Sequence, residues 1–217
     1  MEDKKYIQSV ERALKILTFI ADNREARLND ISAYAGLKTS TAFGLLQTLE
    51  HAGYIARTNK GLDYCLGLNS LKLGLCYSRE SGLSEKIHQL LCGLVDAVDE
   101  TAYFEIGIGK RYYYYDVVLS TRPLKVVPDN DLFINLPEQS AVTKVFSRFA
   151  EGIRYATDIE EVEKGLNCFA VPFRSGDTLI GCVALSGPSN RFTREKMETA
   201  YQAYLDIMKK LDLWDNV

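Results

Sequence analysis

Two histidines, His51 and His88, and five scattered cysteines are the only imidazole and thiol groups in this 217-residue sequence. No two cysteines have the Cys-x-x-Cys spacing and their number is odd, which is typical of reduced thiols rather than of a zinc site or a disulfide framework. The sequence also lacks any run of 18 apolar residues, and its charged, amphipathic start has no signal-peptide apolar centre. We therefore expect a cytoplasmic protein without a metal, a cofactor or a membrane partner.

A large excess of positive charge is missing as well. The formal net charge is −3, from 26 basic and 29 acidic side chains. This balance argues against a protein that coats nucleic acid non-specifically, although residues 1–80 hold eleven basic and nine acidic side chains. A local basic patch is sufficient for specific, salt-sensitive DNA binding, because each phosphate contact releases counterions. The sequence therefore permits a DNA-binding N-terminal part.

Turn and helix signals in the first third of the chain form an ordered pattern. Apolar residues three and four positions apart predict a helix over 28–35, which Gly36-Leu37 ends in a left-handed turn. A second helix follows over 39–52, and we expect a hydroxyl group of Thr39 or Ser40 to cap it. This succession predicts a helix-turn-helix whose second helix recognises DNA.

A hairpin follows the second helix. Residues 54–57 and 62–66 are predicted strands, and Asn59-Lys60-Gly61 provides the turn between them. Polar residues on one helix are most often only its solvated face, but helix, turn, helix and basic hairpin together favour a winged DNA-binding domain. The candidate DNA-binding residues are Lys38, Thr39, Ser40, Thr41, Phe43, Gln47, Arg57, Asn59 and Lys60.

The rest of the chain completes a two-domain organisation. An apolar stripe predicts a further helix near the N-terminus, made by Ile7, Val10, Ala13, Leu14, Leu17, Ile20 and Ala21. We place the DNA-binding domain at residues 1–66, a linker helix at 67–80 and a second domain at 81–217. The length and the 47% hydrophobic content allow a core in each domain.

Runs of strands flanked by helices predict that the second domain is α+β with a largely antiparallel sheet. The predicted helices lie at 83–100 and 191–214, and the predicted strands at 101–108, 111–119, 123–127, 168–174 and 178–187. The run Tyr112–Tyr115 must place alternate side chains on opposite faces of the sheet. Tyr113 or Tyr115 is a candidate for stacking on an aromatic ligand, although packing in the core is the more common role.

An enzyme is the competing class of function. A nucleophilic site needs a serine or cysteine aligned with a histidine, yet His51 falls on the second DNA-binding helix and His88 on the helix over 83–100. Glu160 and Glu161 are adjacent and point apart, so they indicate a solvated acidic loop. Cys168 has no basic neighbour and is interpreted as a small buried residue rather than a reactive thiol. We expect no enzymatic activity.

Several blocks in the right order resemble the IclR family of transcriptional regulators over nearly the whole length. The family's SVxRAL opening is similar to residues 9–14, its GL-x-x-ST block to 36–41, and its LLxTLxxxGY block to 45–54. Its YxLGxxxxxLG block resembles residues 64–74. In the second domain, the Gly-x-x-Cys-x-Ala-x-Pro and Ser-Gly-Pro-x-x-Arg-Phe blocks are similar to residues 165–172 and 186–192.

The resemblance implies a winged helix-turn-helix joined by a linker helix to a GAF-like effector-binding domain. It further implies a homodimer or tetramer that binds double-stranded operator DNA, represses or activates transcription, and responds to a small organic acid or an aromatic metabolite. The effector-binding residues that it implies are Ser140, Ala141, Asp158, Cys168, Ala184 and Ser186, to which the residue argument adds Tyr113 and Tyr115.

The sequence departs from the family pattern at three places. Gly44 stands where the family usually has arginine, and a glycine inside a helix costs about 1 kcal/mol against alanine. Ala184 and Glu138 replace a serine and a histidine of the family's carboxylate-binding set. The stretch between Ala150 and Asp158 is short, so the alternative is a degenerate effector domain that serves only for oligomerisation.

Overall fold

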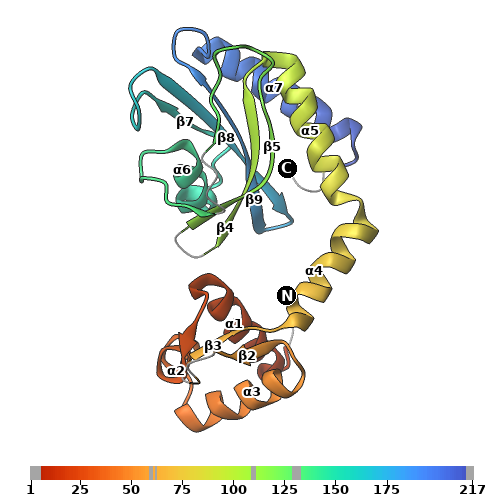
Figure 1. Ribbon diagram of the computed structural model, residues 1–217, viewed down its shortest axis with the longest axis vertical. Helices are drawn as coiled ribbons and strands as arrows, with labels where there is room; N and C mark the ends of the chain where they lie inside the picture. The colour runs from red at the N-terminus through yellow and green to blue at the C-terminus, as the bar shows by residue number, and fades with distance from the viewer. Residues whose placement is uncertain (1–5, 59–60, 62, 109–110, 129–132, 214–217) are drawn as a thin grey trace, which may run out of the picture. The chain divides into compact units, whose positions relative to one another are not determined.

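The computed structural model describes residues 6–58, 61, 63–108, 111–128 and 133–213. The chain divides into two compact units, Met1–Ser81 and Gly82–Val217 (Figure 1). In the first unit the elements are α1 (Gln8–Asn23), β1 (Ala26–Arg27), α2 (Leu28–Ala35), α3 (Thr39–His51), β2 (Ile55–Arg57), β3 (Asp63–Leu66) and α4 (Leu68–Ser81). Among the described residues, no helix is both long enough and apolar enough to cross a bilayer.

The first unit is a small three-helix core closed by a three-stranded antiparallel sheet. Strand β3 lies between β1 and β2 and pairs with both. Helices and strands all contribute to the core, which contains Ile16, Ile20, Ala26, Ile31, Leu46, Leu49, Ile55 and Tyr64. The winged helix-turn-helix that the sequence predicts is therefore confirmed.

The turn between α2 and α3 has the chemistry predicted for it. Gly36 adopts a left-handed conformation with φ of 65°, which costs glycine no side-chain clash. The Leu37 N–H donates to Ser32 O at 2.9 Å, and the Ser32 hydroxyl donates back to Leu37 O at 2.6 Å. These reciprocal bonds fix the angle at which α3 leaves the turn.

Two details of this unit differ from the predictions. Helix α3 begins at Thr39 directly after Lys38, and no side-chain hydroxyl caps it, so the predicted cap is wrong. In α1 the buried residues are Ile16 and Ile20, whereas Ile7, Val10 and Leu14 are 70%, 52% and 58% exposed. The apolar stripe of α1 is longer than the core of its own unit, so its N-terminal half remains uncovered there.

The second unit is an α+β domain, as predicted. It contains α5 (Leu83–Val98), β4 (Thr101–Ile108), β5 (Arg111–Val118), β6 (Phe133–Ile134), α6 (Ala141–Arg148), a 3-10 turn (Phe149–Glu151), β7 (Ala156–Ile159), β8 (Leu166–Ser175), β9 (Thr178–Pro188) and α7 (Arg194–Lys210). The six strands form one antiparallel sheet in the order β6-β5-β4-β9-β8-β7. Figure 1 shows α5 and α7 together on one face and α6 on the other.

Each face of the sheet has its own hydrophobic core. The larger core lies under α5 and α7. It contains six apolar residues of α5 and large side chains of the sheet and α7: Ile87, Leu90, Leu91, Leu94, Val95, Val98, Phe104, Phe169, Phe173 and Tyr204. The smaller core lies under α6 and contains Tyr103, Tyr112, Val142, Val145, Ala170 and Cys182. The face under α6 carries fewer large side chains, which leaves room for a cavity.

Three parts of this unit were not predicted correctly. Residues 123–127 are not a strand and are held instead by side-chain hydrogen bonds to the sheet ends. Strands β6 and β7 are short, and short strands give little periodicity in a sequence. Helix α6 was missed because its sequence is rich in valine and threonine; Ser140 caps it by accepting a hydrogen bond from Thr143 N at 3.1 Å.

Candidate DNA-binding surface and effector cavity

One side of α3 is polar and faces solvent. The side chains of Ala42, Leu46 and Leu49 are buried against the core, which orients the helix about its axis. The opposite side carries six of the candidate DNA-binding residues, all exposed: Lys38, Thr39, Ser40, Thr41, Phe43 and Gln47. The first turn of α3 contains no acidic residue, so nothing there repels a phosphate group.

Arg57 connects the hairpin to α3. Its guanidinium lies 4.8 Å from the centre of the Tyr64 ring and donates to the Tyr64 hydroxyl at 2.9 Å. Its Nε lies 3.5 Å from Glu50 Oε1 on α3. Arg57 therefore braces the hairpin against α3, a role that the sequence did not reveal. Asn59 and Lys60, also candidates, lie outside the described residues.

A cavity of about 220 Å³ lies on the face of the sheet that α6 covers. Its polar lining consists of Tyr103, Glu105, Tyr114, Ser140, Asp158, Cys168 and Ser186. Its apolar lining consists of Val126, Val127, Pro128, Leu136, Ala141, Val142, Val162, Leu166 and Ala184. Strands from the middle of the sheet thus form its floor, and the N-terminus of α6 and the segment 126–128 form its walls.

All six residues carried over from the family pattern line this cavity, although they come from sequence positions 140 to 186. The two tyrosines chosen from the residues alone do not. Tyr115 packs on the other face, edge-on to Phe104, and hydrogen-bonds Ser84. Tyr113 is not among the lining residues either. The alternation predicted for this run is present, but it brings Tyr114 to the cavity.

Three polar lining residues were missed by the sequence argument: Tyr103, Glu105 and Tyr114. Tyr103 and Glu105 lie two positions apart on β4, so both point to the face that α6 covers. The rings of Tyr103 and Tyr114 lie 5.4 Å apart. The sequence did contain a signal for this site: Glu105 is an acidic residue inside an otherwise apolar strand, and it lies two residues after Tyr103, on the same face.

Glu105 is a buried carboxyl group. The residue is 3% exposed, and its Oε2 atom is buried with no hydrogen-bond partner among the described residues. Burial disfavours the charged form and raises the pKa of Glu105 to about 8. The carboxyl group is therefore mainly protonated at neutral pH.

Cys168 and Ser186 lie side by side on β8 and β9. The Ser186 hydroxyl donates to Cys168 Sγ at 3.1 Å. Burial raises the pKa of the Cys168 thiol to about 11, so almost no thiolate is present at neutral pH. This supports the interpretation of Cys168 as a small packing and lining residue.

The acidic segment before Gly165 is not simply a solvated loop. Asp158 is 1% exposed, and its Oδ1 accepts hydrogen bonds from Glu161 N at 2.8 Å and Val162 N at 3.2 Å. Burial is the largest influence on this carboxyl group and raises its pKa. Glu161 pairs with Lys144 of α6 at 2.7 Å, which lowers the pKa of Glu161. Glu160 and Glu161 are exposed, as predicted, whereas Asp158 is a buried part of the cavity lining.

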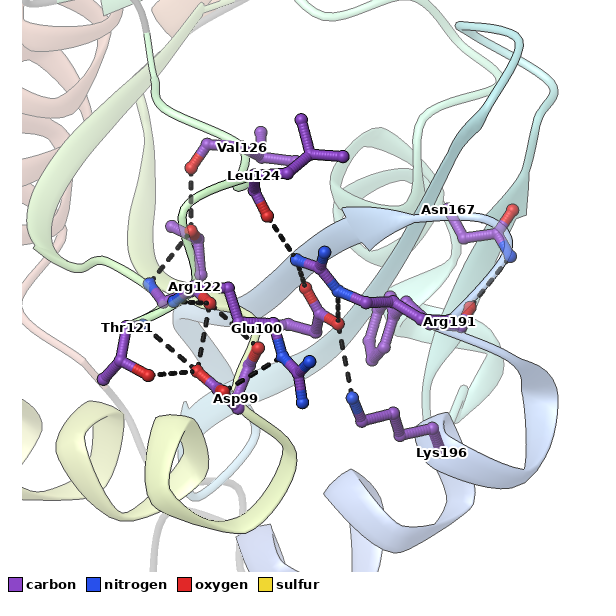
Figure 2. Close-up of polar contacts among 12 residues, drawn as sticks. Asp99, Glu100, Thr121, Arg122, Leu124, Val126, Asn167, Arg191 and Lys196 are labelled. Atoms are coloured by element: carbon purple, nitrogen blue, oxygen red, sulfur yellow. Dashed lines mark hydrogen bonds and ion pairs between the residues drawn. The ribbon is translucent and has the colours of Figure 1, made fainter.

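A buried ion pair supports the wall of the cavity (Figure 2). Arg191 binds Glu100 with two bonds, Nε to Oε1 at 2.7 Å and Nη2 to Oε2 at 2.9 Å, and Glu100 is fully buried. The same guanidinium donates to Leu124 O at 2.6 Å. A Cβ at Gly187 would lie 2.5 Å from Glu100 Oε2, so this position accepts only glycine without a shift. The Ser-Gly-Pro-x-x-Arg-Phe block is thus a support for the segment before residue 126.

Asp99 holds the start of the same segment. It accepts hydrogen bonds from the Ser120 hydroxyl and from Thr121 N, and it pairs with Arg122 at 3.0 Å (Figure 2). The hydrogen bond from the Thr121 hydroxyl is the largest cause of the lowered pKa of Asp99. The Thr101 hydroxyl donates to Val126 O at 2.7 Å. A strand was predicted at 123–127, but side-chain bonds hold this part of the chain where backbone hydrogen bonds between strands were expected.

A larger hollow of about 420 Å³ lies elsewhere in the second unit and contains none of the candidate residues. It is lined by Phe149, Ala150, Gly152, Ile153, Arg154, Val171, Pro172, Arg174, Asp177, Tyr201 and Tyr204. It lies beside the short stretch after Ala150 and beside residues 171–174 of β8, which are beyond the residues of β8 that pair with β7. The candidate effector-binding residues lie in the smaller cavity, where buried polar groups converge, as is common in ligand sites.

The comparisons with known proteins agree with this arrangement. The family model described as the IclR helix-turn-helix domain matches residues 9–58. The glycerol operon regulatory protein of Streptomyces coelicolor is 28% identical over 226 residues, which cover 87% of this chain and 88% of that protein. Such relatives are named as transcriptional regulators, which are not enzymes.

Solved structures show the same fold at lower identity. An IclR family transcriptional regulator from Brucella abortus has a TM-score of 0.62 and 18% identity, covering 97% of this chain and 93% of that chain. An IclR homologue from Microbacterium hydrocarbonoxydans, complexed with 4-hydroxybenzoate, has a TM-score of 0.52 and 16% identity, covering 94% and 99%.

The fold is a winged helix-turn-helix followed by an α+β second domain, and residues 9–58 match the IclR helix-turn-helix domain. Along most of its length the chain is similar to proteins named as transcriptional regulators. These findings indicate a DNA-binding transcriptional regulator similar to those of the IclR family.

Proposed function

We propose that this regulator binds an operator duplex through α3 and the β2–β3 hairpin, and that a small organic molecule in the 220 Å³ cavity changes this binding. The observation that carries the first part is the orientation of α3. Its buried side is fixed by the core, so Lys38, Ser40 and Gln47 are presented to solvent together. In a recognition helix such positions contact base edges and phosphates.

The cavity supports the second part of the proposal. The polar groups that line it come from β4, β5, β7, β8, β9 and the start of α6, which is typical of a ligand site and exceeds what packing needs. An effector domain that serves only for oligomerisation would not need these convergent groups. The rings of Tyr103 and Tyr114 favour an aromatic effector over a fully polar one. The related protein bound to 4-hydroxybenzoate shows that this fold accepts an aromatic molecule.

We further propose a homodimer or tetramer, acting in the cytoplasm, with the DNA-binding units in contact. The support is the apolar surface that the first unit leaves exposed. It comprises Ile7, Val10 and Leu14 of α1 and Leu68, Leu71, Leu73, Leu75 and Tyr77 of α4. Exposed apolar groups of this number mark an interaction surface. Two copies would then bind the two half-sites of a pseudo-palindromic operator.

Binding to a duplex selected by the wild-type protein from a random library tests the placement of α3. We expect Gln47→Ala to relax the base preference, because the amide contacts a base edge. Lys38→Ala should lower affinity evenly across sequences and flatten the salt dependence by about one phosphate contact. Lys60→Ala is expected to act as Lys38→Ala does.

The control is Lys209→Ala, which removes one positive charge from α7 in the second unit. It should leave both the affinity and the salt slope unchanged. Wild-type binding profiles for both Gln47→Ala and Lys38→Ala would show that α3 is not the recognition helix.

A further inference from the structure

The cavity of the second unit has an unusual balance of charge. Of the described residues that line it, two have carboxyl side chains, Glu105 and Asp158, and none is lysine, arginine or histidine. Lys144 of α6 is the nearby base, but its Nζ donates to Thr157 O at 2.8 Å and to both oxygens of Glu161. A ligand in this cavity therefore meets acidic groups and no described positive charge.

Glu105 is the group that lacks a partner. Glu105 lines the cavity, and its Oε2 atom is buried and makes no hydrogen bond with any described residue. Buried polar groups in folded proteins nearly always have a hydrogen-bond partner, because burying one without a partner costs free energy. An unpaired one beside an open cavity points to a partner that arrives with the ligand.

The groups around Glu105 do not supply that partner. On the neighbouring strands it pairs in register with Tyr114 and Cys182. Its other titratable neighbours are Tyr103, Tyr112 and Cys168, and Asp158 lines the same cavity. Burial raises the pKa of all three of these neighbours, so they are neutral at pH 7. No described cation faces Glu105 from the strands on either side.

Two aromatic rings complete the environment. Tyr103 and Tyr114 line the cavity with their ring centres 5.4 Å apart. The faces of tyrosine rings attract cations, and the attraction is stronger where water is excluded. A carboxyl group and two phenol rings form a typical binding environment for an organic ammonium group.

We infer that the cavity takes a small organic cation, a primary ammonium attached to an apolar or aromatic group, with Glu105 as its counter-ion. This inference rests on the proposed function and specifies the chemical class of the effector. It departs from the organic acids expected from the family resemblance, because a carboxylate would find two acidic groups and no base here. Binding of the cation ionises Glu105 and releases one proton to solvent.

Isothermal titration of the full-length protein with benzylamine, benzyl alcohol and benzoate tests the inference, because the three probes share a ring and differ in the polar group. We expect benzylamine to bind at least tenfold more tightly than the other two at pH 7. Its affinity should rise as the pH increases from 6.5 to 8, and its binding heat should depend on the buffer as one released proton requires. Benzoate would show the opposite pH trend, because it needs the protonated carboxyl group.

Two carboxyl variants separate the roles of neighbouring acidic groups. Glu105→Gln should weaken benzylamine at least tenfold and abolish the proton release, while benzyl alcohol binds as before. Glu163→Gln is the matched control, because Glu163 lies close to Asp158 in the sequence but is exposed and does not line the cavity. It should leave benzylamine binding unchanged.

The outcomes distinguish this inference from the proposed function. Tighter binding of benzoate or benzyl alcohol would overturn the cation assignment and leave a ligand-sensing regulator intact. Benzylamine binding without proton release, or unaffected by Glu105→Gln, would overturn the role of Glu105. If none of the three probes binds at millimolar concentration, the cavity is not a site for small aromatic molecules. DNA binding is measured separately on the selected duplex, so that result would leave the proposed DNA-binding function untouched.

Discussion

Single side chains determine how firmly the cavity wall is held. Arg191 is the clearest case, because one guanidinium both neutralises the buried Glu100 and fixes the backbone at Leu124 (Figure 2). Without it, Glu100 would keep only Lys196, whose Nζ lies 3.3 Å from Oε1. Removing one partner of a buried pair is costly because the other charge stays buried.

We therefore expect Arg191→Ala to lower the free energy of unfolding of the second unit by about 3 kcal/mol. Urea denaturation of the full-length protein measures the change. Arg148→Ala is the matched control: Arg148 also pairs with a glutamate, Glu151, at 3.0 Å, but both side chains are more than half exposed. Its loss should cost less than about 1 kcal/mol. Equal losses in the two variants would contradict the role given to burial.

The candidate site shows which residues a sequence can reveal. Ser140, Cys168 and Ser186 were found because they fall in blocks with recognisable spacing. Glu105 was missed because a single glutamate in a strand has no motif, and only the register of β4 places it beside the cavity. Tyr114 was missed because the alternation of side chains along a strand places neighbours on opposite faces of the sheet, but it does not show which of the two faces borders the cavity.

Among the elements, those with strong periodicity were predicted well. Helix α5 has six buried apolar residues at helical spacing; it begins at the predicted residue and ends two residues before the predicted end. The segment 123–127 shows the opposite case. Its apolar residues suggested a strand, but Pro123 and the side-chain bonds from Thr101 and Arg191 hold it as an irregular wall. Such bonds join positions far apart in the sequence, so local pattern does not predict them.

The two glycines of the helix-turn-helix give a prediction about α3. Gly44 lies inside the helix with open space around it, so Gly44→Ala should stabilise the protein by roughly 0.5–1 kcal/mol through helix propensity. Gly36 also has open space, but its φ of 65° is unfavourable for alanine. Gly36→Ala should therefore destabilise the protein by about 1 kcal/mol.

Thermal and urea denaturation of both variants measure these opposite signs. The comparison is informative because each variant adds the same methyl group at an uncrowded position. A destabilising Gly44→Ala would show that the exposed side of α3 is covered by another part of the assembly, which would weaken its assignment as the DNA-binding surface.

For the molecule as a whole, the folded chain leaves apolar surface that its own units do not cover. In α1 the buried residues begin at Ile16, while the exposed Val10 and Leu14 continue the same helix towards the N-terminus. A sequence shows that such a stripe exists, but only the fold shows which part of it the chain itself buries. The predicted stripe is present in α1, but only Ile16 and Ile20 are buried within the chain itself, which supports the proposed contact with a second copy.

We expect Leu14→Glu to weaken the dimer at least tenfold, because it introduces a charge into an apolar contact that must exclude water. Sedimentation velocity over a range of protein concentrations measures the dimer dissociation constant. Ser9→Glu is the matched control, because it adds the same charge to an exposed position of α1 that lies about 140° around the helix axis from Leu14.

The affinity for the operator should fall when dimer formation is weakened. Leu14→Glu is expected to lose most of its affinity for a two-half-site duplex and little for a single half-site, because each monomer keeps an intact α3. Ser9→Glu should behave as the wild-type protein in both assays. If Leu14→Glu stays dimeric at the concentrations at which the wild-type protein does, the exposed half of α1 is not the dimer contact, and the apolar residues of α4 become the surface to test.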